Sequence, residues 1–357
     1  MAEWLEGNAV TERLKEIATS DRLQTDLNFR NANCSGHSFK GLMLAECEFE
    51  NIQFESADLE DSNFSDCKMN SINFNGANLK NATFYKTLMN HCTAVKASGY
   101  RWSVLQSNIN KLDASEAVFP EAKFIQSPMK DVNLSKANLD NASITLSTQT
   151  RTNFTEAYLR QTTLFELNLK SCLFVKVNAP KVVLSGSILD GIHFKDAILT
   201  LAQFNKSSLK EVIFSGDNLT GACFVDSQLN QANFDGCNLT NATFLRCNLT
   251  ESSLKNAIFT KARATRSQFI KATLNGLQAP QSIWHLTNLE GADCQNTVFS
   301  HADLIGSNLR DANFKGANLY QTRVDLTQRE GAKFDLDAFV STSAPNKDYA
   351  SYVMANS

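Results

Sequence analysis

The sequence has no apolar run approaching the 18 or so residues that a membrane-spanning helix needs, and its mean hydropathy is −0.26. The first six residues, Met1 to Glu6, lack the basic start and the apolar core of a secretory signal. The 34 Lys and Arg residues nearly balance the 37 Asp and Glu residues, which leaves a net charge of −3. These absences predict a cytoplasmic protein that enters no membrane, with export by a specialised secretion system left open.

The usual signatures of catalysis and cofactor binding are also missing. The five histidines are scattered, and no H-E-x-x-H motif, C-x-x-C pair or glycine-rich phosphate loop occurs. Of the nine cysteines, only Cys223 is predicted to face outward, and the others act as small apolar residues in a packed interior. We therefore expect no enzymatic activity, no cofactor and no metal site.

What the sequence does contain is a five-residue period. Of its 24 phenylalanines, all but Phe165 have numbers ending in 4 or 9, and this register continues without a slip from Phe29 to Phe334. Two residues before each large residue the chain prefers a small one, most often alanine. A period of five fits neither an α-helix nor an ordinary alternating strand, whereas a coil that turns a corner every five residues fits it. The sequence therefore predicts a repeat protein.

The run from Ala232 to Phe244 shows the unit clearly: small, then Asn, Asp or Thr, then Leu or Phe, then two polar residues. This A-(N/D)-(L/F)-x-x pattern resembles the pentapeptide-repeat family, and the resemblance covers roughly residues 25 to 339. It implies an all-β solenoid, a right-handed quadrilateral β-helix with four pentads per turn and about 15 coils. Pro120, Pro180 and Pro280 are separated by multiples of 20 residues, which places them on the same corner of such a coil.

The ends of a solenoid need a cover for the core and for the strand edges. Residues 11 to 23 have the pattern of a short amphipathic helix with Thr11 as its N-cap. We predict an N-terminal helical cap over 1–24, the β-helix over 25–339, and a C-terminal tail or cap over 340–357. The tail and the residues just before it supply apolar side chains, namely Phe339, Tyr349, Tyr352, Val353 and Met354. Closing the last coil of a monomer is the favoured role, and an end-to-end dimer is the alternative.

Three segments keep the register but not the residue pattern: Cys92 to Ala114, Ser143 to Thr152, and Leu277 to Thr287. In the first of them Trp102 falls on a small-residue position, where an indole would crowd the core. Two interpretations stay open. The segment is either a recognition loop, or a bulged coil with a repacked core. The loop would present Tyr100, Arg101 and Trp102, residue types that often anchor interfaces.

Charge is unevenly distributed along the chain. Residues 46 to 66 contain acids and no Lys or Arg, and we name this segment the acidic collar; residues 246 to 271 are rich in Lys and Arg and form the basic band. Like charges 20 residues apart would stack on one face, which either an oppositely charged partner or screening by salt would offset. The candidate interaction residues are Glu46, Glu48, Glu60, Asp61 and Asp66 of the collar, Arg246, Arg263 and Arg266 of the band, and Tyr100, Arg101 and Trp102.

A rigid scaffold that binds a protein partner, not yet identified, is the function that this architecture favours. The family resemblance implies an alternative, because some members imitate duplex DNA and bind DNA gyrase or topoisomerase IV, protecting them from quinolones. A net charge of −3 is far below the charge of DNA, about one per 1.7 Å of axis. A secretion- or virulence-associated role in bacteria is implied by the resemblance alone. Direct nucleic-acid binding is not expected, since the pI is about 6.0 and the basic band has no aromatic residues interleaved with its bases at outward positions.

Overall fold

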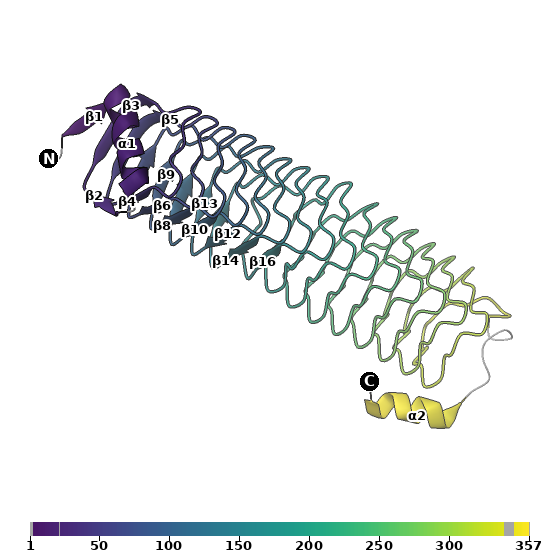
Figure 1. Cartoon of the computed structure of the whole chain (residues 1–357). Helices are drawn as coiled ribbons and strands as arrows, with labels where there is room; N and C mark the ends of the chain where they lie inside the picture. Colours follow the sequence, from purple (N-terminus) through teal and green to yellow (C-terminus); the bar gives the residue numbers. More distant parts are fainter. Residues whose placement is uncertain (1–2, 21, 339–345, 357) are drawn as a thin grey trace. The chain divides into compact units, whose positions relative to one another are not determined.

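The computed structural model describes residues 3–20, 22–338 and 346–356. These fall into two compact units, unit 1 (Met1–Ala179) and unit 2 (Pro180–Ser357). Within each unit the chain forms a parallel β-solenoid whose paired residues are 20 apart, which is four pentads per turn. The stacked turns are visible in Figure 1. The predicted fold class, an all-β solenoid of quadrilateral coils, is confirmed.

Unit 1 contains two parallel sheets of eight strands each. One sheet has the order β1 (Trp4–Glu6), β3 (Asn28–Asn33), β5 (Glu48–Gln53), β7 (Lys68–Asn70), β9 (Leu88–Asn90), β11 (Asn108–Asn110), β13 (Met129–Lys130) and β15 (Gln149–Thr150). The other consists of β2 (Gln24–Thr25), β4 (Met43–Ala45), β6 (Asn63–Ser65), β8 (Thr83–Tyr85), β10 (Ser103–Leu105), β12 (Lys123–Ile125), β14 (Ser143–Thr145) and β16 (Thr163–Phe165). Each sheet therefore has one strand from each of eight turns.

In its described residues, unit 2 keeps the same register without forming regular strands. Isolated parallel bridges, again 20 residues apart, run from Val183↔Gln203 to Asn313↔Lys333. Eight turns therefore contain regular strands, whereas about 15 coils were expected from the sequence. The reason is that the short faces of unit 2 pair through single residues rather than through strands of two or more.

The core consists of the two inward residues of each pentad, as the period predicts. Large residues at numbers ending in 4 or 9, and small ones ending in 2 or 7, are almost all buried. In unit 2, Phe194 and Phe234 stack on Phe214 from the neighbouring turns, with ring centroids 5.1 and 5.2 Å away. A second column places Phe224 against Phe244 at 4.7 Å. Offset stacks of this kind add about 0.5–1.5 kcal/mol each beyond their buried area.

One corner of the coil has inward residues that carry hydroxyl or thiol groups in nearly every turn. Its members are Cys47, Cys67, Thr87, Ser107, Ser127 and Ser147 in unit 1, and Ser187, Ser207, Ser227, Cys247, Ser267, Thr287 and Ser307 in unit 2. The Ser127 hydroxyl donates to the Val104 carbonyl at 2.9 Å and accepts from the Ser107 backbone N–H at 3.2 Å. Because a buried backbone N–H needs an acceptor, this corner favours a hydroxyl over alanine.

The outward residues have two structural tasks. An Asn or Asp two residues after a corner accepts from the backbone N–H two residues later, as Asn133 does from Ser135 at 3.1 Å, and Asn133 also donates to Asp113 one turn earlier. The corner residues, at numbers ending in 1 or 6, have φ near +55°. No Val, Ile or Thr occurs at these corners, because β-branched side chains fit the left-handed region poorly.

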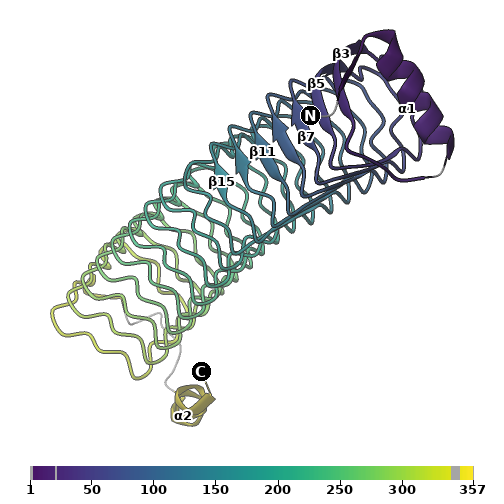
Figure 2. The same ribbon diagram turned by 90° about the vertical axis from the view of Figure 1, so that its left-hand side faces the viewer.

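The helix α1 (Asn8–Ser20) packs against the first turn of unit 1 through Val10, Leu14 and Ile17. Figure 2 shows it across the end of the coil. The predicted cap is present, but the helix begins three residues earlier than expected. Thr11 is therefore not the N-cap; it lies inside the helix, and its hydroxyl donates to the Asn33 carbonyl at 3.1 Å.

The helix α2 (Lys347–Asn356) packs on the side of unit 2. Ala350 and Val353 form a buried apolar cluster with Ile305, which is fully buried although its position faces outward. Tyr349 packs against this cluster, and its ring lies 4.5 Å from the guanidinium carbon of Arg323. The contacts that we describe for α2 are thus with the flank of the coil, where a cap over its end was expected. Phe339 lies outside the described residues.

Candidate functional site

Most ion pairs of the two solenoids join residues exactly one turn apart in sequence number. Among the described residues, ten pairs follow this rule, namely Lys40–Glu60, Glu48–Lys68, Glu60–Lys80, Lys96–Glu116, Arg101–Glu121, Asp131–Arg151, Asp140–Arg160, Asp226–Arg246, Asp303–Arg323 and Arg310–Glu330. Each pair places opposite charges on neighbouring turns, about 4.8 Å apart along the backbone stack. Six of these pairs contain an arginine, so an exposed arginine of the described coils that has no acid one turn away is an exception.

The acidic collar follows this rule in part. Glu60 contacts both Lys40 (3.3 Å) and Lys80 (2.8 Å), and Asp61 lies 3.7 Å from Lys40. The hydrogen bond from Lys80 and the contact with Lys40 hold the pKa of Glu60 below its ordinary value. Lysines on the adjacent turns thus offset part of the collar's charge. These lysines lie outside residues 46–66, so the charge of that segment alone did not reveal them. The signal in the sequence is their spacing of 20 residues from the acids.

The other collar residues lie where the register predicts. Glu48 pairs with Lys68 at 2.5 Å. Glu46 and Asp66 occupy left-handed corners of consecutive turns, with φ of 54° and 51°. These two acids lie one turn apart, as expected from their numbers.

The segment around Trp102 is a regular coil that keeps the 20-residue register, so it forms neither a recognition loop nor a bulge, while the expected repacking of the core is present. The Trp102 side chain is 1% exposed and packs between the rings of Phe84, Phe119 and Phe124 at centroid distances of 4.8–5.5 Å. Gly99 makes the room, because a Cβ there would lie 2.8 Å from the Phe119 ring and 3.1 Å from the Trp102 Cβ. Trp102 is therefore not a surface residue.

Tyr100 and Arg101 are at the surface but already have a partner. The Tyr100 hydroxyl donates to one carboxylate oxygen of Glu121 at 3.1 Å, and the Arg101 Nε donates to the other at 2.9 Å. The Arg101 guanidinium also lies 4.9 Å from the centroid of the Tyr100 ring. The bond from Arg101 holds the pKa of Glu121 below its ordinary value.

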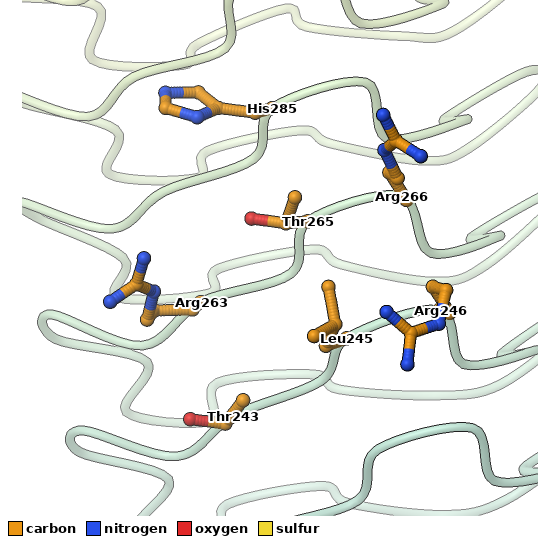
Figure 3. A pocket seen from close by; sticks show the side chains of 7 residues that line it. All are labelled: Thr243, Leu245, Arg246, Arg263, Thr265, Arg266 and His285. Atoms are coloured by element: carbon orange, nitrogen blue, oxygen red, sulfur yellow. The ribbon is translucent and has the colours of Figure 1, made fainter. Parts of the chain in front are cut away.

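The basic band contains an open groove of about 390 Å³ that we name the basic groove. It crosses three consecutive turns and is lined by Thr243, Leu245, Arg246, Arg263, Thr265, Arg266 and His285. Figure 3 shows Thr265 between the side chains of Arg263 and Arg266. Arg246 and Arg266 are left-handed corner residues on adjacent turns, with φ of 56° and 55°. The three arginines predicted from the sequence thus lie in one groove.

Arg246 is held by a carboxylate on the preceding turn. Its Nε and Nη2 donate to the two carboxylate oxygens of Asp226 at 2.7 and 2.9 Å. This two-point contact holds the pKa of Asp226 below its ordinary value. Arg246 is therefore oriented at one edge of the groove, with its charge partly offset.

Arg263 and Arg266 depart from the charge-pairing rule. Their neighbours one turn away are Thr243 and Ile283 for Arg263, and Arg246 and Leu286 for Arg266. Among the residues that the structure describes, neither guanidinium has a carboxylate within ion-pair distance, and both side chains are exposed. The groove thus presents two cations whose donors are available.

At the far edge of the groove, successive contacts connect His285 through Asp303 and Arg323 to Tyr349 of α2. His285 Nε2 lies 3.2 Å from an Asp303 carboxylate oxygen, and Arg323 lies 3.5 Å from the same oxygen. Burial by itself raises the pKa of Asp303, but the contacts with His285 and Arg323 outweigh burial and hold that pKa below its ordinary value. Arg323 in turn lies against Tyr349, so α2 begins to cover the flank where the groove ends.

Other candidate chemistries find little in the described residues. No three His, Cys, Asp or Glu side chains there come together as metal ligands would. Neither described helix is long and apolar enough to cross a bilayer. All nine cysteines are free thiols, and Cys223 is the one that is not fully buried, as predicted.

The interior of each described solenoid is filled with side chains, and the groove and the ion pairs lie on its surface. This arrangement defines the class of solenoid scaffolds. Two family models match the sequence: one described as a pentapeptide repeat region over residues 187–263, and one described as pentapeptide repeats (8 copies) over 25–61, 57–93 and 287–326. Together these segments cover just over half of the chain. The chain belongs to the pentapeptide-repeat family. No curated protein sequence matches it.

Several solved structures are similar to this chain. HetL, a pentapeptide repeat protein involved in heterocyst differentiation regulation from the cyanobacterium Nostoc sp. strain PCC 7120, is 18% identical over 87% of this chain and 94% of its own, with a TM-score of 0.23. QnrB1, a plasmid-mediated fluoroquinolone resistance protein, is 14% identical over 56% of this chain and 92% of its own, with a TM-score of 0.35. Rfr23 from the cyanobacterium Cyanothece 51142 is 16% identical over 51% and 91%, with a TM-score of 0.13.

Proposed function

We propose that this protein is a scaffold that binds a partner protein through the basic groove and performs no catalysis. The observation that carries the proposal is the pair Arg263 and Arg266. Elsewhere in the described solenoids arginines on the coil surface pair with acids on a neighbouring turn, whereas these two present free donors beside Arg246. An acidic segment of a partner would supply the missing carboxylates and remove the repulsion between Arg246 and Arg266.

The DNA-mimicking alternative has weaker support. It would use the acidic collar, but Lys40, Lys68 and Lys80 contact its acids from the adjacent turns. A surface with alternating charges does not resemble the uniform negative charge of duplex DNA. The collar is therefore a secondary candidate, and a bacterial origin and a cytoplasmic location stay predictions from the sequence.

Affinity capture from a lysate of the source organism, with mass spectrometry, tests the proposal. The wild type is compared with Arg263→Glu/Arg266→Glu and with a matched charge reversal at exposed lysines elsewhere in unit 2, Lys195→Glu/Lys210→Glu. A collar variant, in which Glu48, Glu60 and Asp61 are changed to Lys, tests the DNA-mimicking alternative. We expect proteins that the groove variant loses and the lysine variant retains, with weaker capture at high salt because exposed charges are screened.

Two results would contradict the proposal. If the groove variant captures the same proteins as the wild type, the groove is not the docking site. If gyrase or topoisomerase IV subunits are captured and only the collar variant loses them, the DNA-mimicking alternative replaces it.

A further inference from the structure

The charge and donor pattern of the basic groove defines its ligand more narrowly than an acidic partner in general. All three cations in it are arginines, although lysine is common elsewhere on the surface of this chain. A guanidinium offers a planar fork of donors that matches two oxygens of one anion, whereas a lysine ammonium acts as a point charge. The groove therefore selects for a ligand that accepts several directed hydrogen bonds.

The oxygens of a phosphoryl group fit this arrangement better than a carboxylate does. A phosphate monoester carries a charge of about −1.5 to −2 at neutral pH and three acceptor oxygens, whereas a carboxylate carries a single charge and two oxygens. Arg263 and Arg266 leave their forks available, and the Thr265 hydroxyl lies between them. A phosphoryl group approached by these two exposed arginine side chains and by the hydroxyl would offer an oxygen to each of the three, whereas a carboxylate has only two oxygens.

The length of the groove limits the number of phosphates. Asp226 pairs with Arg246 at one edge, and Asp303 contacts His285 at the other. The turns that carry the cations between these acids span about 10 Å. A segment of this length can reach few phosphates of a nucleic-acid backbone, fewer than the roughly 6–10 contacts of a strongly salt-dependent DNA-binding protein, and it suits a single phosphoryl group.

The exposure of the groove favours a phosphate presented by another protein. Arg246, Arg263 and Arg266 are all exposed. A free metabolite is usually enclosed by its site, with most of its surface buried. A phosphorylated side chain needs no such enclosure, because the rest of the partner contributes contacts alongside. Leu245 supplies an apolar surface in the groove for a residue next to the phosphorylated one.

We propose that the basic groove binds a phosphorylated serine or threonine side chain of the partner protein, with Arg263 and Arg266 as the paired phosphate ligands and Thr265 as a third donor. This inference rests on the proposed function, because it specifies what the groove recognises on the partner. Arg246, held by Asp226, supplies a fixed positive edge beside the phosphate.

The test uses the full-length protein and fluorescent degenerate peptide libraries with a fixed phosphoserine or phosphothreonine. Matched libraries carry Ser, Thr or Glu at the fixed position, and a single-stranded DNA oligonucleotide serves as the nucleic-acid probe. We expect the phosphorylated libraries to bind at least ten-fold tighter than the others, with inorganic phosphate competing. Arg263→Ala and Arg266→Ala should each weaken binding at least ten-fold, since a charged hydrogen-bonding contact is lost.

Control variants separate geometry from charge and from folding. Arg266→Lys keeps the charge but not the fork, so it should bind less tightly than the wild type and more tightly than Arg266→Ala. Lys195→Ala/Lys210→Ala should bind the phosphorylated libraries as the wild type does. Equal melting temperatures across the variants show that none of the losses comes from unfolding.

The outcomes distinguish this inference from the proposed function. If the Glu library binds as tightly as the phosphorylated libraries and depends on the same arginines, phosphate recognition is overturned and acidic-partner docking stands. If the oligonucleotide binds tighter than the phosphopeptides with the same dependence, the ligand is nucleic acid. Both proposals are overturned if two results occur together. In the first, no library binds in a way that depends on the arginines; in the second, Arg263→Glu/Arg266→Glu captures the same proteins from the lysate as the wild type.

Discussion

Within the described coils, Asp217 is the acidic residue that is buried at a small inward position, where it is 1% exposed. Its Oδ1 accepts from the Ala197 backbone N–H at 2.8 Å, while Oδ2 has no hydrogen-bond partner within the described structure. Burial is the largest influence on this carboxyl and raises its pKa to about 8. Near pH 7 the folded protein therefore holds Asp217 protonated, whereas in the unfolded chain it is ionised.

This difference gives stability a defined pH dependence. Because the folded-state pKa lies above the unfolded value of about 3.9, the contribution of Asp217 is greatest below that value and is lost as pH rises toward about 8. Asp217→Asn keeps an acceptor for Ala197 and removes the titration. We expect this variant to be more stable than the wild type by about 2–4 kcal/mol at pH 7, with a gain that grows from pH 5 to pH 8.

Urea unfolding at several pH values measures this gain. Asp226→Asn provides the contrast. Arg246 lowers the pKa of Asp226, so the ionised carboxylate stabilises the fold, and replacing it with the neutral amide should destabilise the protein above about pH 4. Equal pH slopes for the wild type and Asp217→Asn would show that Asp217 is ionised in the folded protein.

Gly99 and Trp102 form a matched pair in the core of unit 1. A Cβ at position 99 would meet the Phe119 ring at 2.8 Å and the Trp102 Cβ at 3.1 Å. Gly99→Ala should therefore destabilise the protein by about 1–3 kcal/mol through overpacking. In a Trp102→Ala background the Phe119 ring can shift into the space that the indole leaves, so the same change should be less damaging, and a double-mutant cycle in urea measures the difference. Additive effects of the two changes would argue against this packing.

The residue scale also shows what the sequence can and cannot predict. The five-residue period identified nearly the whole core, because it fixes which side chains face inward. It did not predict that Trp102 is buried, since that depends on Gly99 and on rings from the adjacent turns. The partners of the charged residues were missed for a related reason: Lys40 and Lys80 are far from Glu60 in sequence and one turn away in space. Likewise, nothing in the run of bases from 246 to 271 separates Arg246, which has an acid one turn away, from Arg263 and Arg266, which do not.

At the scale of elements, the helix at each end was predicted with unequal success. The amphipathic pattern located α1 to within three residues. The contact surface of α2 was missed, because its apolar residues were interpreted as a cover for the end of the coil. The sequence signal is Ile305, an apolar residue at an outward position, next to Gly306, where an ideal Cβ would lie 2.7 Å from the Met354 sulfur.

The docking of α2 can be tested by placing a charge at its buried face. Val353 is 3% exposed, whereas Tyr352 on the same helix is 64% exposed. Val353→Asp would bury a charge against Ile305, which is strongly unfavourable, so α2 should detach. Hydrogen exchange followed by mass spectrometry should show faster exchange at 347–356 and 303–306 in Val353→Asp, and no change in Tyr352→Asp. Unchanged protection in both variants would show that α2 is not held by this face.

At the scale of the whole molecule, the described bridges and ring stacks join each turn to its neighbours one turn away. The stability of such a protein is approximately a sum of contributions from individual turns and their nearest neighbours. A core defect should therefore be felt mainly in the unit that contains it. This expectation differs from that for a globular domain of one core, which unfolds as a whole.

Phe214 is suited to test this locality, because its ring stacks on those of Phe194 and Phe234 within unit 2. Phe214→Ala removes both stacks and should cost about 3–5 kcal/mol. Hydrogen exchange should accelerate across the turns of unit 2 that flank residue 214, while unit 1 keeps its protection. Phe64→Ala, which removes contacts with Phe49 and Phe84 in unit 1, should give the reverse pattern. A uniform loss of protection in both units from either change would mean that the solenoid unfolds as a single cooperative body, because only then does the free energy lost at one turn lower the stability of every other.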